Sequence, residues 1–333
     1  MKRIVLAVFV MALSATTALA QQPIDIKFSH VVAKNTPKGE AAEYFKKLAE
    51  ERTKGRVKVE VYPNSVLYKD GEEMEMLQIG AVQMLAPSVA KFGPLGAKEF
   101  EVFDLPYLFD NFADLHKVTQ GPVGQALLKK LEARGLTGLA FWDNGFKVMS
   151  ANKPLRTPAD FKGLKMRIQS SKVLDQQMRD LGAIPQMMAF SEVYQALQTG
   201  VVDGTENPPS NLYTQKMYEV QKYVTLSNHG VIEYAVIVNK KFWAGLPTDI
   251  RAALESAMKD ATTYANDIAK KENDDALEAV RKSGRTQIYE LTPEERRAWK
   301  KALINVHREQ GSRIGKETLD AIYKAIAFDP NKL

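Results

Sequence analysis

Two hydrophobic periods alternate along the N-terminal part of the chain, and this alternation restricts the fold more than any other feature. Apolar and polar residues alternate over residues 24–28 and again over 57–61, and a period of two predicts strands. Between them, apolar residues recur at helical spacing over 41–48, behind a helix start at Thr36 and Pro37. Strands that alternate with helices predict an α/β fold with a largely parallel sheet.

The same rhythm continues through the middle of the chain. A helix is expected to begin at an Asp70 cap, with Glu73 three residues later in a capping box. An unbroken apolar run over residues 231–238 fits a buried strand that connects two lobes. The other expected elements are strands at residues 137–142, 147–150 and 164–168, and helices at 171–181 and 191–199.

One helix is expected to be unusually long. Residues 248–282 keep the helical spacing of apolar side chains without a breaker, which predicts about 35 residues where about 8–20 are typical. A helix of that length can lie across two domains and brace them. Thr292, Pro293 and Glu295 mark the capped start of a further helix.

The first 20 residues have the layout of a secretory signal peptide. Lys2 and Arg3 precede an apolar stretch over residues 4–13, and Ala18 and Ala20 form a small-x-small cleavage pattern. The stretch is short for a membrane anchor, so we expect export, cleavage before Gln21 and a periplasmic protein. The chain has no cysteine, which excludes disulfides and a lipid anchor on cysteine.

The composition limits the classes of function. The chain has 46 basic and 40 acidic residues, and its basic pairs have no interleaved aromatic residues, so nucleic-acid binding is not expected. No nucleophile-elbow, dinucleotide, phosphate-loop or zinc-protease motif is present. The four histidines are scattered, and His116 and His307 are expected on partly exposed helix faces. We therefore expect no enzyme, no metal and no cofactor.

Four motifs between residues 141 and 209 occur in a specific order. They are KVMSANKP at 147–154, GLKMR at 163–167, YQALQTG at 194–200 and VVDGTENP at 201–208. Through them, and over essentially all of the mature chain, the sequence resembles the DctP-type extracytoplasmic solute-binding proteins of TRAP transporters, the tripartite ATP-independent importers. Segments 85–94 and 103–107 are most similar to the dicarboxylate-binding branch.

The resemblance implies that Arg167 forms a bidentate salt bridge with the carboxylate of the ligand. The sequence agrees, because Arg167 lies near the end of an apolar strand and α/β proteins bind ligands beyond strand ends. A guanidinium offers two parallel N–H donors that match a carboxylate. Asn207 matches the asparagine that hydrogen-bonds the same carboxylate, and Phe190 matches an aromatic residue that covers the ligand. The alternatives are a surface arginine, a turn asparagine and a core aromatic residue.

Other candidates follow from position in the sequence. Lys147 stands where the family often has a second arginine, and whether it contacts the ligand directly, through water or only by its field stays open. Trp142 and Asn144 line the same crevice or belong to the core. A diacid needs a second anion site, for which the segments after predicted strands offer His30, Lys34, Ser88 and Lys91.

These features predict a two-lobed α/β periplasmic-binding-protein fold with mixed sheets, a hinge and a long bracing helix. After the signal peptide at residues 1–20, lobe I is expected at 21–144 and 235–270, and lobe II at 145–234 and 271–333. The lobes are expected to close around the ligand about crossings at residues 144–146 and 231–235.

The resemblance implies a four-carbon dicarboxylate such as malate, succinate or fumarate as the ligand. It also implies the small and large membrane subunits of a TRAP permease as partners, with the binding protein a monomer. Two alternatives remain at this stage. One is the same fold with a monocarboxylate ligand, such as a sugar, keto or aromatic acid. The other is an exported lyase or hydrolase that acts on an organic acid.

Overall fold

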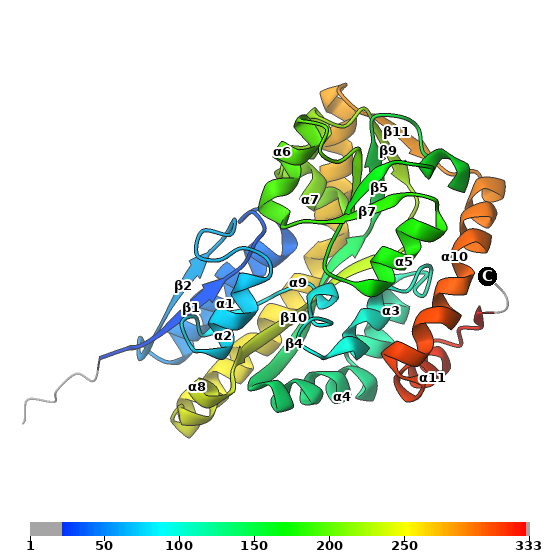
Figure 1. The fold of residues 1–333 in the computed structure, drawn as a ribbon. Coiled ribbons are helices and arrows are strands. Elements are labelled where there is room, and N and C mark those ends of the chain that lie inside the picture. Colours follow the sequence, from blue (N-terminus) through cyan, green and yellow to red (C-terminus); the bar gives the residue numbers. More distant parts are fainter. Residues whose placement is uncertain (1–21, 331–333) are drawn as a thin grey trace, which may run out of the picture.

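A computed structural model describes residues 22–330, which form a mixed α/β protein with two separate sheets (Figure 1). The predicted signal peptide lies outside the described residues. Within them, no helix is both long enough and apolar enough to cross a membrane. The two-lobed α/β prediction is confirmed, with one lobe built on each sheet.

The first sheet has five strands in the order β2-β1-β3-β10-β4. Strand β1 pairs in parallel with β2 and with β3, as the alternating pattern predicts, whereas β10 is antiparallel to both β3 and β4. The sheet is therefore mixed and not largely parallel, because β10 returns to it from the other lobe. Its strands are β1 (Ile24–Ser29), β2 (Val57–Tyr62), β3 (Met84–Leu85), β4 (Leu136–Phe146) and β10 (Val231–Asn239).

The second sheet has six strands in the order β11-β9-β5-β8-β6-β7. Strand β6 lies between β7 and β8 and is parallel to both, which brings the ends of these three strands to one edge. Its strands are β5 (Val148–Ala151), β6 (Lys165–Ile168), β7 (Ile184–Met187), β8 (Gly204–Asn207), β9 (Tyr223–Leu226) and β11 (Gln287–Glu290).

Helices cover both sheets. The first seven are α1 (Pro37–Arg52), α2 (Glu72–Gln78), α3 (Phe112–Thr119), α4 (Pro122–Lys130), α5 (Lys172–Asp180), α6 (Val193–Gln198) and α7 (Pro209–Thr214). The later ones are α8 (Lys240–Gly245), α9 (Thr248–Ser283), α10 (Pro293–Ile314) and α11 (Lys316–Ala325).

Helix α9 confirms the prediction of one very long helix, with 36 residues. It packs against α1 and β4 of the first lobe and against α7 of the second. Figure 1 shows it running from the α8 end of the molecule to the β11 end, alongside both lobes. A single rigid element thus contacts both sides of the hinge.

Local signals set two of the predicted helix starts, and a third prediction fails. Thr36 and Thr292 cap α1 and α10 as predicted. The predicted Asp70 capping box is wrong, because Gly71 precedes α2 with a φ of 89° and makes no side-chain cap. Asp70 instead turns toward the other lobe. The prediction for His307 is also wrong, since this residue is buried, with its ring nitrogens bonded to Pro106 O and the Tyr323 hydroxyl.

Two strand crossings join the lobes, in addition to the connection through α9. From β4 the chain passes directly into β5 of the second sheet, and it returns through Gly230 into β10. Lys147 N donates to Gly230 O over 2.9 Å, which ties the crossings together. A Cβ at position 230 would stand 2.9 Å from Cε of Lys147, so any other residue here would displace the end of that side chain. The predicted lobe boundaries, 144/145 and 234/235, lie beside these crossings and stay a prediction.

A pair of buried acids lies in the same two strands. Glu233 of β10 is opposite Asp143 of β4, next to a β-bulge, and both are fully buried. His116 Nε2 lies 2.6 Å from Asp143 Oδ2. Burial, followed by the charge of Asp143, raises the pKa of Glu233 well above its ordinary value of 4.5. The folded protein therefore holds a proton here that the unfolded chain releases more readily.

This pair predicts a loss of stability as the pH rises. A carboxyl whose pKa is raised by folding stabilises the fold fully below its ordinary value and loses that contribution as the pH climbs toward the raised value. Glu233→Gln is expected to raise the Tm at pH 8 by about 2–6 °C and to flatten the decline in Tm above pH 5. Calorimetry between pH 4 and 9 measures this. Glu255→Gln, at an exposed position, is the control. Parallel curves of Tm against pH for wild type and Glu233→Gln would contradict the prediction.

Candidate functional site

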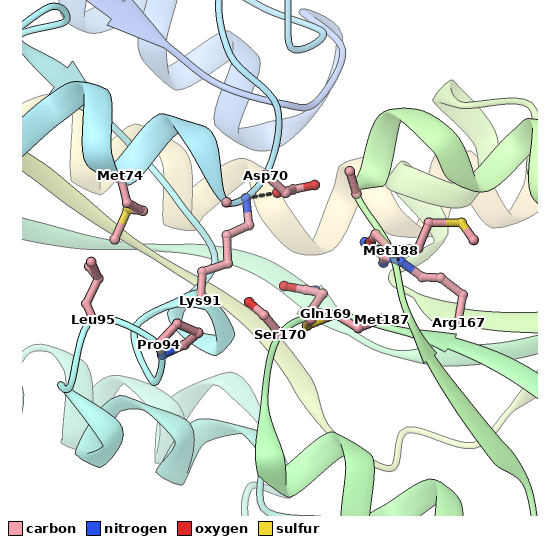
Figure 2. A pocket seen from close by; sticks show the side chains of 12 residues that line it. Asp70, Met74, Lys91, Pro94, Leu95, Arg167, Gln169, Ser170, Met187 and Met188 are labelled. Carbon is pink, nitrogen blue, oxygen red and sulfur yellow. Dashed lines mark hydrogen bonds and ion pairs between the residues drawn. The ribbon is translucent and has the colours of Figure 1, made fainter.

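Arg167 lies in a cleft between the two lobes. It occupies the third position of β6, has 2 % of its surface exposed and lines two adjoining cavities of about 380 and 20 Å³ (Figure 2). Nε and Nη2 donate to Met188 O over 3.1 and 2.8 Å, and the Phe190 ring centroid lies 5.7 Å from the guanidinium carbon. The backbone just after β7 thus fixes one edge of the guanidinium, and the Nη1 edge stays available for a ligand.

The charge of Arg167 has no direct counter-ion. Among the described residues, no carboxylate lies within ion-pair distance of it. Burial lowers the pKa of Arg167, while Asp70 and Glu206 act from a distance to raise it, and a guanidinium remains charged throughout. A buried cation that lacks a partner is costly unless an anion binds to it. This side chain is therefore the candidate anion-binding group of the cleft.

Asn207 comes to the same place as Arg167. It ends β8, whose Thr205 is paired in register with Arg167, and it lines the smaller cavity. Its Nδ2 makes one long contact of 3.4 Å to the Thr205 hydroxyl, and its Oδ1 has no hydrogen-bond partner among the described residues. The amide is therefore free to turn toward a ligand. Phe190 forms another wall of this cavity, and its role over a ligand stays a prediction.

Lys91 approaches Arg167 from the first lobe. It is 7 % exposed and forms ion pairs with Asp70 and with Glu73, the latter at 2.6 Å. Burial disfavours its charge, but these two carboxylates more than compensate and raise its pKa. Figure 2 shows Asp70 and Lys91 pointing toward each other, with Arg167 reaching the pocket from the opposite lobe. The cleft thus has one cation on each side.

Hydroxyl groups stand beside Lys91. Ser88 and Tyr234 both line the smaller cavity. The Tyr234 hydroxyl accepts from Asn144 Nδ2 at 2.7 Å, so its own proton remains available for donation. Asn144 also accepts from the Ser210 hydroxyl, and it therefore supports the cavity from beneath and does not line it. Burial raises the pKa of Tyr234 to about 12, which keeps the hydroxyl protonated.

Lys147 occupies a separate buried cluster. Its Nζ lies 2.9 Å from Glu206, which also bonds His229 Nε2 at 2.7 Å. Burial opposes ionisation of Glu206, but Lys147 and then His229 lower its pKa to about 2. Lys147 lines neither cavity, because Glu206 holds its charge within the second sheet. Lys147 is thus held away from the two cavities, and its role toward a ligand stays a prediction.

The structure does not bring the remaining predicted residues to the cleft. The Lys34 side chain is 68 % exposed and pairs with Glu43. Trp142 packs on Phe28 in the core of the first lobe and donates to the Thr262 hydroxyl, so it is a core residue. His30 is buried behind Val31 and Val32, and burial, followed by the nearby charge of Lys38, lowers its pKa to about 3.

Several cleft residues escaped the sequence reasoning. Gln169 and Asn211 line the smaller cavity with Arg167, and each has an unpartnered side-chain oxygen. Lys38 is buried in the first turn of α1, where it donates to Ala86 O at 2.9 Å and lies 3.7 Å from the Tyr234 ring centroid. A lysine in the first turn of a helix opposes the helix dipole, and this unfavourable position could have marked Lys38 as a candidate functional residue. The other missed residues are Asp70 and Tyr234.

This arrangement is that of a receptor for a small organic anion, with hinged lobes and a polar, cation-lined cleft between them. Comparison with known proteins agrees. The model of the bacterial extracellular solute-binding proteins, family 7 (DctP), matches residues 28–313. The chain therefore belongs to this family.

Three related proteins are informative. The chain is 65 % identical to the C4-dicarboxylate-binding periplasmic protein DctP of Rhodobacter capsulatus over 317 residues. These aligned residues cover 95 % of each protein. It is 42 % identical to a TRAP periplasmic solute-binding protein from Shewanella oneidensis solved with bound succinate, with a TM-score of 0.89 over 91 % of this chain and 99 % of that one. A sugar-acid-binding protein from Advenella mimigardefordensis, solved with galactonate, is 33 % identical with a TM-score of 0.89, covering 92 % and 98 %.

Proposed function

We propose that this protein is the extracytoplasmic solute-binding subunit of a TRAP importer and captures a four-carbon dicarboxylate by closure of its two lobes. One observation carries the proposal. A buried arginine without a direct counter-ion faces a buried lysine across the cleft, so a short molecule with an anion at each end can bridge them. The similarity to a C4-dicarboxylate-binding protein and to a succinate complex supports this ligand class.

In the proposed complex, one carboxylate binds Arg167 and Asn207 in the second lobe. Charge-assisted N–H donation to the carboxylate is strong there because lobe closure removes water from the pair. The second carboxylate binds Lys91 with the hydroxyls of Ser88 and Tyr234 in the first lobe. Binding across the two lobes favours the closed state, since only that state makes both sets of contacts.

The monocarboxylate alternative is supported by one observation, the galactonate complex of a protein with the same fold. A single carboxylate needs only the Arg167 side of the cleft. The two ligand classes differ at the Lys91 side of the cleft, where Lys91 already pairs with Asp70 and Glu73 and a diacid would add a third carboxylate. We favour the dicarboxylate because of the similarity to a C4-dicarboxylate-binding protein and to a succinate complex. A lyase or hydrolase would require reacting groups poised at the cleft, and the proposal assigns none.

Export to the periplasm and delivery to the two membrane subunits of a permease are part of the same proposal. Removal of residues 1–20 is expected to leave Gln21 as the first residue of the mature protein. Mass spectrometry of the protein secreted to the periplasm measures this directly.

A panel of organic acids tests the ligand class. A ligand at 100 times its Kd stabilises the folded state by about 2.7 kcal/mol, which raises the Tm of a protein of this size by several degrees. Succinate, fumarate and malate are expected to give such shifts, and butyrate and galactonate are expected to give little. A large shift with a monoacid and none with the diacids would replace the proposal with the monocarboxylate alternative. Chemical turnover of any bound acid would favour an enzyme.

A further inference from the structure

The loop between β2 and α2 makes a buried polar contact across the cleft. Asp70, in this loop of the first lobe, accepts a hydrogen bond at Oδ2 from Phe190 N of the second lobe. The Asp70 side chain is only 14 % exposed. The same loop makes a second cross-cleft contact through Lys69 and Glu192 at 3.0 Å, but both of those side chains are half exposed and solvent screens them.

Asp70 and Arg167 hold two ends of one short segment. Arg167 donates to Met188 O, and Phe190, two residues later, donates its backbone N–H to Asp70. The Phe190 ring lies over the guanidinium and forms a wall of the smaller cavity. The residue that covers the ligand is thus fixed from its own lobe by Arg167 and from the opposite lobe by Asp70.

We propose that Asp70 is a positioning residue that latches the closed lobes by holding Phe190 over the bound carboxylate. This inference rests on the proposed function. Asp70 reaches Phe190 only when the lobes are together, so its contact stabilises the closed state selectively. A carboxylate that accepts from a backbone N–H makes a charge-assisted hydrogen bond, which is stronger than a neutral one. Dissociation requires opening, and the latch therefore slows ligand release more than it speeds capture.

The surrounding charges keep Asp70 ionised. Burial alone would raise its pKa, but Lys91 and then Arg167 lower it to about 2. Lys91, pinned between Asp70 and Glu73, also fixes the direction of the Asp70 side chain. The latch is therefore intact at neutral pH.

Asp70 has one alternative role, for which removal of its side chain has the opposite effect on ligand affinity. Its carboxylate can compete with the second carboxylate of the ligand for Lys91. In that case, removal of Asp70 frees the lysine, and the diacid binds more tightly. The latch predicts weaker retention of the ligand on the same substitution, so one kinetic measurement separates the two roles.

The test uses stopped-flow measurement of succinate association and dissociation on the mature protein. Asp70→Ala is expected to raise the dissociation rate about tenfold or more and to change the association rate by less than about threefold. Asp70→Asn keeps an acceptor oxygen without the charge, so its dissociation rate is expected to lie between those of wild type and Asp70→Ala. Lys69→Ala, which removes the exposed contact of the same loop, is the matched control and is expected to leave both rates near wild type.

The outcomes separate the latch from the proposed function. Unchanged dissociation or tighter binding in Asp70→Ala would overturn the latch while leaving dicarboxylate binding intact. Failure of the wild-type protein to bind any four-carbon diacid would overturn both. If Asp70→Ala does not fold, Asp70→Asn decides, because the latch requires it to release succinate faster than Lys69→Ala. Small-angle X-ray scattering of the liganded proteins provides a second measurement. The latch predicts a larger radius of gyration for Asp70→Ala than for wild type, because the variant spends more time open.

Discussion

Replacement of Arg167 by lysine is expected to weaken succinate binding by about 30-fold to several thousandfold, although the charge is retained. The lysine loses both donors to Met188 O, so the segment that carries Phe190 is no longer fixed from its own lobe. It also replaces a planar fork with a point charge, which cannot donate two parallel hydrogen bonds to a carboxylate. Both losses fall in a buried site where water cannot compensate.

Isothermal titration calorimetry measures this effect. Arg179→Lys is the matched control, because Arg179 is 60 % exposed on α5, pairs with Asp175 and lies on the same lobe. It is expected to leave the Kd unchanged. A Kd for Arg167→Lys within threefold of wild type would mean that the ligand does not bind this guanidinium, and the proposed function would lose the observation that carries it.

Replacement of Lys91 by methionine is expected to have two separate effects. Affinity for succinate should fall about 30-fold or more, because the second carboxylate loses its cation. Affinity for butyrate, which has the same chain length and one carboxylate, should change far less. An equal proportional loss for the two acids would show that Lys91 does not distinguish a second carboxylate.

The second effect concerns folding. Without Lys91, Asp70 and Glu73 are left buried without their shared counter-ion, and breaking such a pair costs about 3–5 kcal/mol at neutral pH. The two carboxyls then gain protons more readily when folded than when unfolded, so the deficit should shrink as the pH falls toward 4. Thermal unfolding between pH 4 and 8 measures it. Lys117→Met is the control and should cost little, because the Lys117 side chain, which pairs with Asp114, is 56 % exposed.

The site was only partly predictable from the sequence, and the charged residues show why. Lys147 and Lys91 both seemed suited to a carboxylate ligand, but the structure gives Lys147 a buried partner 59 positions away and places Lys91 in the cleft. Asp70 fitted the local pattern of a helix cap, yet its oxygen bonds a backbone N–H 120 positions later. A local pattern cannot decide between such partners, since the alternatives lie far apart along the chain.

The sequence by itself determined a large part of the elements of this protein and their order. Alternation and helical spacing report which face of a segment is buried, and that is a local property, so β1, β2, β4, β5, β6 and β10, the 36-residue α9 and the capped start of α10 follow from it. The motifs determined the family and led to Arg167. Tertiary structure alone decided how the cleft is charged: which lysine has a counter-ion, which tyrosine and asparagine point inward, and that Asp70 crosses between the lobes. The physical reason is that the energy of a buried charge depends on all its neighbours in space, and these come together only when both lobes have folded.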